Sequence, residues 1–179
     1  PLDVAAAREV IEGDTLLASY CVGREATYLL ALHRGRLEAH TIAIGRTALA
    51  GRVREYRSLM ADPGSAPAEL RELGRELGSL LLGPLQPRLG KAKRLMVCPD
   101  GPLNVLPFAA LVLPDGAWLA ERLPSFQALS VTVFAQDRQR RRARTEQPTV
   151  VAFGDPRYPG TDAEWQRAAS WAAVRAGEL

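Results

Sequence analysis

The stretch KRLMVCPDGPLNVLPFAAL, residues 93–111, decides the fold class. Its apolar run Leu95–Cys98 is typical of a buried central strand, because a strand covered on both faces is apolar throughout. Pro99 cannot donate to a strand ladder, and Asp100-Gly101-Pro102 is a turn sequence. Pro107 then opens a short helical turn. The stretch therefore predicts a buried strand, a tight turn and a helix start.

The segments before this stretch predict an antiparallel meander. Its three strands are expected over Thr15–Val22, Ala26–Leu32 and Leu37–Ile44, joined by turns that contain glycine. A short helix, Val4–Ile11, precedes them, with Asp3 positioned to accept hydrogen bonds from its first free amides. The second strand is nearly all apolar, so the meander must be covered on at least one face.

Two helices are expected between the meander and the central strand. The first, Thr47–Met60, carries apolar residues at helical spacing: Leu49, Val53, Tyr56 and Met60. The second runs from Pro67 to about Leu82, and Gly74 and Gly78 lie four residues apart within it. Because each glycine costs a helix roughly 1 kcal/mol against alanine, we expect both to mark a close contact with a neighbouring backbone.

Strands and helices also alternate downstream of the central strand. After a hairpin at Asp115-Gly116, a strand is expected over Ser125–Leu129, followed by a helix that Ser130 caps. A further buried strand, Thr149–Phe153, precedes a last amphipathic helix, Asp162–Ala176. This alternation indicates an α/β layer architecture.

Several of these motifs together resemble the CHAT domain, a caspase-like cysteine peptidase module often attached to tetratricopeptide repeats. The strand, Pro-Asp-Gly-Pro turn and Leu-Pro-Phe helix start of residues 95–108 are similar to its first motif. Further similar segments are Pro114-Asp115-Gly116, Trp118–Arg122, Leu129–Val133 and Val150–Pro156, with Asp14–Leu29 resembling the strands that precede the domain. The match is strongest between residues 84 and 156.

The resemblance implies a caspase-like α/β/α sandwich, of which this chain would hold the first half of the sheet. We expect residues 1–62 to form an N-terminal helix, meander and helix, and residues 66–179 to be the N-terminal part of the CHAT domain. The catalytic His-Gly and Cys-Glu motifs of the family follow a segment like Phe153–Pro156, and this sequence has neither. The resemblance therefore implies a parent peptidase that cleaves a partner protein in bacterial signalling or defence, with this segment inactive alone. The alternative is a non-catalytic interaction module on a degenerate caspase-like scaffold.

The sequence offers no convincing catalytic or metal-binding set of its own, so no catalytic, cofactor or metal residue is assigned. Cys98 ends a predicted strand and Cys21 lies inside another, so both are expected to be buried thiols. His33 and His40 flank a turn and are expected to be solvated. Their spacing, with Cys21 or Glu38 as a further ligand, matches no common zinc pattern.

The charged residues likewise fit structural roles. Asp100, Asp115 and Asp155 each lie beside Gly or Pro, where side-chain hydrogen bonds stabilise turns. A basic cluster, made of Arg138, Arg140, Arg141, Arg142 and Arg144, is interpreted as a solvated helix end that complements the helix dipole. A nucleic-acid patch is the weaker alternative, since no aromatic residues interleave with the arginines.

Composition sets the remaining bounds. With 47% hydrophobic and 24% charged residues and a net charge of +3, the chain has the profile of a soluble globular protein. No apolar run reaches the ~20 residues that span a bilayer. We expect a cytoplasmic protein without cofactor or membrane contact. Its expected partners are a protein substrate or regulator, another copy of the chain, or the missing C-terminal half of the domain.

Overall fold

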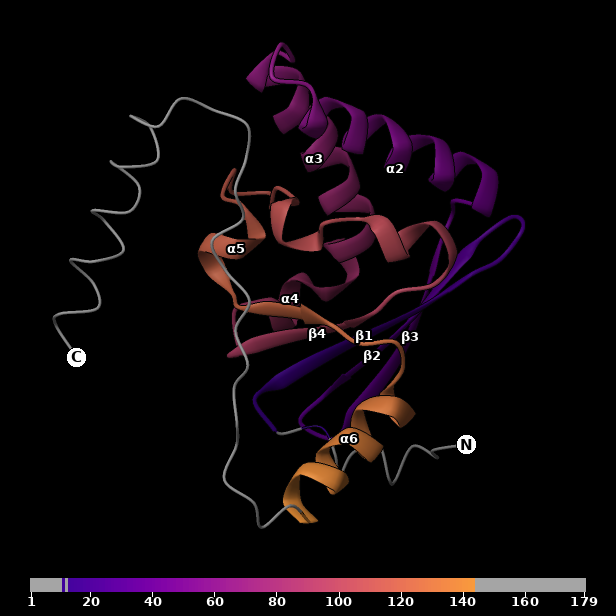
Figure 1. Cartoon of the computed structure of the whole chain (residues 1–179), viewed down its shortest axis with the longest axis vertical. Helices are drawn as coiled ribbons and strands as arrows, with labels where there is room; N and C mark the ends of the chain where they lie inside the picture. The colour runs from indigo at the N-terminus through magenta and orange to yellow at the C-terminus, as the bar shows by residue number, and fades with distance from the viewer. Residues whose placement is uncertain (1–10, 12, 144–179) are drawn as a thin grey trace, which may run out of the picture. The chain divides into compact units, whose positions relative to one another are not determined.

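A five-stranded mixed sheet, in the order β3-β2-β1-β4-β5, forms the centre of the molecule (Figure 1). This computed structural model describes residues 11 and 13–143. The strands are β1 (Thr15–Val22), β2 (Thr27–His33), β3 (Arg36–Ile42), β4 (Arg94–Cys98) and β5 (Ser125–Gln127). β1, β2 and β3 pair in antiparallel fashion, whereas β4 runs parallel to both β1 and β5. The predicted α/β class is confirmed.

The meander, which was expected within the N-terminal segment of residues 1–62, belongs to the same sheet as the central strand. Leu17 of β1 lies opposite Met96 of β4, and the two strands pair over five positions from Thr15 to Ser19. The central strand is flanked by β1 and β5, and its side chains are buried in core clusters on both faces of the sheet, as its apolar sequence requires. The predicted division at residues 62–66 stays a prediction, but strands from both sides of it share one sheet.

One face of the sheet is covered by most of the helices. These are α2 (Arg46–Ala61), α3 (Pro67–Leu82) and α4 (Gln86–Leu89), then the 3-10 turns η1 (Gly83–Leu85), η2 (Gly101–Val105) and η3 (Phe108–Ala110), and α5 (Leu119–Arg122). Leu49, Val53 and Tyr56 of α2 are buried as predicted. Met60 is 42% exposed, so its predicted place in the apolar stripe is wrong. We call this side of the sheet the covered face.

Gly74 and Gly78 are the close contact points that their spacing predicted. A Cβ atom on Gly78 would lie 2.1 Å from the carbonyl oxygen of Val112, a distance that no packed structure tolerates. The Val112 amide donates to the carbonyl of Gly74 at 3.2 Å. A side chain at Gly78 is excluded because the hairpin after η3 packs directly on the α3 backbone, whereas one at Gly74 would make tight contacts of 3.1–3.3 Å with the side chains of Tyr56 and Val112.

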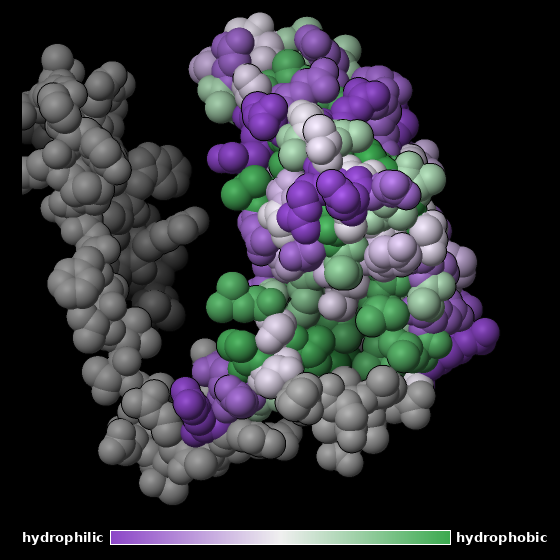
Figure 2. Space-filling view, turned by 90° about the vertical axis from the view of Figure 1, so that its right-hand side faces the viewer, coloured by the Kyte–Doolittle hydropathy of each residue, from purple (hydrophilic) through white to green (hydrophobic). Residues whose placement is uncertain are grey.

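Within residues 11 and 13–143, the opposite face carries one helix, α6 (Val131–Ala143), over a small cluster that includes Leu17, Leu32 and Met96. We call it the thin face. Ser130 begins α6 as predicted, since its hydroxyl accepts from the Val133 amide at 3.1 Å. Figure 2 shows one side of the molecule, where apolar residues gather in the lower half and hydrophilic residues predominate above them.

Some predicted boundaries differ from the structure. β5 ends at Gln127 rather than Leu129, and the Leu129 side chain is 82% exposed. Residues 1–10, the predicted strand Thr149–Phe153 and the predicted helix Asp162–Ala176 lie outside the described residues.

Candidate functional site

The parallel strands β1, β4 and β5 end at one edge of the sheet, the place where open α/β sheets commonly bind ligands. Val22, Cys98 and Gln127 are the last residues of these strands. Turns, glycines and the start of α2 surround this edge. It is therefore the natural place to look for a site.

Asp100 and Arg46 bind the end of β1 rather than standing free for chemistry. The Asp100 carboxylate accepts a hydrogen bond from the Val22 amide at 2.7 Å, and the Arg46 guanidinium donates to the Val22 carbonyl at 2.6 Å. The two side chains are 3.9 Å apart. Gly101 adopts φ +55, and a Cβ atom there would lie 2.7 Å from the Arg46 guanidinium. We call this arrangement the strand-end clip, and it gives Asp100 a structural role.

Asp115 also serves its turn, as its sequence context predicted. Its carboxylate accepts from the Ala117 amide at 3.1 Å and from the Arg122 guanidinium at 2.8 Å. The amide of Ala117 is the main cause that lowers the pKa of Asp115. Asp155 lies outside the described residues.

Cys98 is a buried thiol on the thin face, as predicted. Burial raises its pKa to about 11, which keeps it protonated and unreactive near neutral pH. Cys21 was expected to be buried and is exposed. It alternates along β1 with Tyr20 and Val22, which point into the covered-face core, so the Cys21 side chain emerges on the thin face.

Both histidines lie on the covered face, where the predicted solvation of His33 is wrong and His40 is half-buried. His33 is only 6% exposed, and burial is the first cause of its lowered pKa, with Arg34 and Arg88 adding to it. His40 lies opposite Leu29, a core residue of that face. Between them, Glu38 forms an ion pair with Arg88.

The two cysteines and two histidines are the full complement of the chain, and the structure describes all four. The cysteines lie on the thin face and the histidines on the covered face, with the sheet between them. No thiol therefore has an imidazole base within reach. Within residues 11 and 13–143, no group of three or more potential ligands could hold a metal ion.

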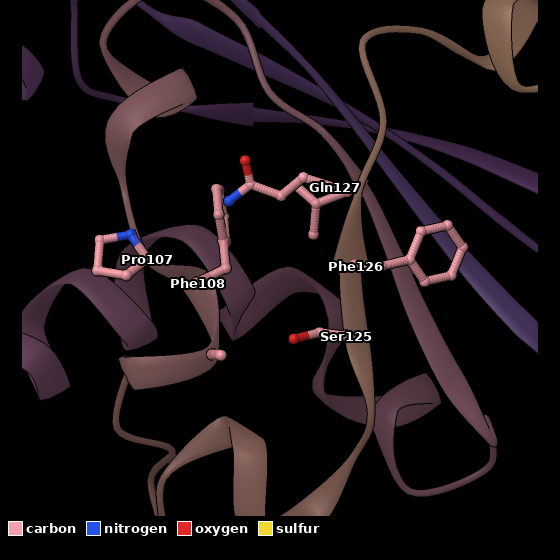
Figure 3. A pocket seen from close by; sticks show the side chains of 7 residues that line it. Pro107, Phe108, Ser125, Phe126 and Gln127 are labelled. Carbon is pink, nitrogen blue, oxygen red and sulfur yellow. The ribbon is translucent and has the colours of Figure 1, made fainter. Parts of the chain in front are cut away.

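A small cavity beside β5 was not predicted from the sequence. It has a volume of about 150 Å³ and its lining carries no charged side chain. Figure 3 shows Ser125 and Gln127 pointing toward Pro107 and Phe108, whereas Phe126 points to the opposite side of the strand. The side-chain amide of Gln127 donates to the backbone carbonyl of Leu106 at 3.0 Å, which fixes β5 against the loop before η3.

The basic cluster is described only in part. The Arg138 guanidinium lies 5.9 Å from the centre of the Phe134 ring, and Arg140 is exposed. The side chains of Arg141, Arg142 and Arg144 lie outside the described residues. The expected absence of nucleic-acid binding stays a prediction.

Comparison with models of known protein families shows which family the chain belongs to. The model of the CHAT domain family matches residues 71–177, more than half of the chain. The chain belongs to the CHAT domain family. The match includes the strand-end clip residue Asp100, the cavity and α6, so the CHAT assignment rests on the region that surrounds the candidate site.

Other comparisons are distant. No curated protein matches the CHAT chain significantly. Among solved structures, "Alp12 filament structure" is 8% identical with a TM-score of 0.36, over 74% of this chain and 48% of that one. "Crystal structure of apo psk41 parM protein" is 12% identical with a TM-score of 0.33, over 69% of this chain and 39% of that one. The chain thus spans less than half of either structure, and neither likeness indicates a shared function.

That the protein makes no membrane contact stays a prediction, and the described helices bear only on whether it spans a bilayer. None of those within residues 11 and 13–143 is long and apolar enough to cross a bilayer.

Proposed function

We propose that this chain is the structural part of a CHAT cysteine peptidase, in a cytoplasmic bacterial protein that cleaves a partner protein in signalling or defence. In this proposal the described sheet supports the domain and its partner contacts. The nucleophile and its base come from residues outside this chain.

The separation of thiols from imidazoles supports the proposal. A cysteine nucleophile needs a thiolate, a base within hydrogen-bond reach and access for substrate. Cys98 fails on all three counts, because it is buried, its pKa is about 11, and both histidines are across the sheet. Cys21 is exposed, but it lies on the thin face, whereas both histidines lie on the covered face.

A peptidase assay on two forms of the protein tests the proposal. The chain alone should cleave nothing in a mixed peptide library. The longer product of the same gene, with the residues encoded after Leu179, should show cysteine-dependent cleavage that Cys98→Ala and Cys21→Ser leave unchanged. Cleavage by the chain alone that disappears in either variant would overturn the proposal. An inactive longer product would favour the non-catalytic interaction module instead.

A further inference from the structure

Among the described residues, no backbone group pairs with the outer edge of β5. The Leu95 amide donates to the Pro124 carbonyl, and the Ala128 amide donates to the Val97 carbonyl, both at 2.9 Å. Hydrogen-bonding residues alternate along a parallel ladder, so Ser125 and Gln127 direct their backbone groups away from β4. In the part of the chain that the structure describes, β5 is the last strand and no other strand pairs with that edge.

The cavity lies between β5 and residues 107–109 and has the size of one side chain. Its volume of about 150 Å³ is well below the ~300–1,000 Å³ of sites that enclose drug-sized ligands. Cavities of about this size hold a single benzene-sized group. The lining is neutral, with Val97, Phe108 and Ala109 among its apolar members. An uncharged side chain of valine or leucine size therefore fits it best.

Chain topology argues against the predicted strand Thr149–Phe153 as a parallel occupant. The connection from β4 to β5 crosses the covered face, where Leu103, Phe108 and Leu119 join the core. The chain then leaves β5 through α6, which packs on the thin face. A parallel strand added outside β5 would extend the sheet in the same direction as the step from β4 to β5. Its connection would cross the thin face instead of the covered face, so the two connections would have opposite handedness. Such crossovers are right-handed in about 98% of cases, so both connections cannot follow the rule.

We propose that the β5 edge and its cavity form a docking groove for an extended segment of a partner protein. The segment adds a strand to the sheet through the backbone groups of Ser125 and Gln127. One of its apolar side chains enters the cavity beside Ala109. This combination of main-chain pairing for affinity and a side-chain pocket for specificity is an established mode of peptide recognition.

Three capped heptapeptides serve as probes: Thr-Val-Thr-X-Thr-Val-Thr with X as Val, Gly or Asp. Binding to the full chain is followed by NMR titration. We expect the peptide with X as Val to bind at least tenfold more tightly than the other two, with shifts centred on Ser125 and Gln127. Equal affinities, or no binding of any peptide, would overturn the proposal.

Matched variants locate the binding. Ser125→Pro removes an amide that points away from β4, so it should abolish binding while the ladder to β4 stays intact. Ser125→Ala keeps that amide and should bind normally. Ala109→Leu, at an exposed cavity residue, should reduce binding at least tenfold even if Ser125→Pro proves unstable. Unchanged binding in Ser125→Pro or in Ala109→Leu would contradict the groove.

Two further outcomes would assign the edge to another occupant. If the peptide binds the Val151→Asp variant but not the unsubstituted chain, the predicted strand Thr149–Phe153 of the chain itself fills the groove. A dimer that light scattering detects and Ser125→Pro abolishes would show that a second copy fills it. Because peptide binding requires no catalysis, failure here leaves the peptidase proposal intact, and the converse also holds.

Discussion

The two faces of the sheet differ in how much they bury and in which chemistry they carry. Successive residues of β2 illustrate this: Leu29 is fully buried on the covered face, whereas its neighbour Leu30 is 46% exposed on the other. The covered face holds both histidines, and the thin face holds both cysteines. The difference teaches that one face supplies most of the stability, while the sheet separates groups that a catalytic pair would need together.

The pair Leu29 and Leu30 gives the sharpest test of this comparison. Leu29→Ala removes a fully buried side chain and leaves a cavity, so it should lower the free energy of unfolding by about 4 kcal/mol. Leu30→Ala is the matched control on the opposite face and should cost less than about 1 kcal/mol. Urea unfolding followed by circular dichroism measures both. Similar losses would mean that the thin face is as well packed as the other.

The contact between α3 and the hairpin should give the next largest effect. Gly78→Ala places a Cβ atom against the Val112 backbone, and the resulting shift should cost about 3 kcal/mol. Gly51→Ala, also within a helix but with nothing within 4 Å, should instead stabilise the protein by about 0.5–1 kcal/mol. Thermal unfolding distinguishes them, and a stabilising Gly78→Ala would refute the close approach.

The thin face should show a smaller, pH-dependent effect through Cys98. Its folded pKa of about 11 exceeds the ordinary value of 9, so the unfolded chain ionises first as pH rises. The stability from the protonated thiol is complete below pH 9 and should fall by about 2 kcal/mol as pH rises to 11. In Cys98→Ala the pH dependence of unfolding should be flatter over that window. Tyr56, whose pKa burial raises to about 12, contributes equally in both proteins.

Local patterns predicted most of the fold. The bounds of α3, the cap at Ser130 and the two contact glycines follow from short-range sequence rules, and the structure agrees with each. The pairing of β1 with β4 left no local signal, since parallel strands far apart in sequence share no turn. The exposure of Cys21 was missed because β1, TLLASYCV, is apolar at almost every position and does not reveal which residues face the core.

The cavity and the histidine burial depend on tertiary contacts that no spacing announces. Residues 107–109 and 125–127 form the cavity together because the side-chain amide of Gln127 donates a hydrogen bond to the Leu106 carbonyl. His33 becomes buried near Arg88 of α4, which follows it by more than 50 residues in the sequence.

The parallel pairing of β1 with β4 has a consequence during translation. The meander can fold as soon as it leaves the ribosome, because β1, β2 and β3 are joined by short turns. The inner edge of β1 must then wait for β4, and at about 5–20 residues per second the roughly 50 residues between β3 and β4 take on the order of 3–10 s to synthesise. The nascent chain thus displays an apolar, unpaired strand edge for seconds, which makes this interval the natural point for a chaperone to bind.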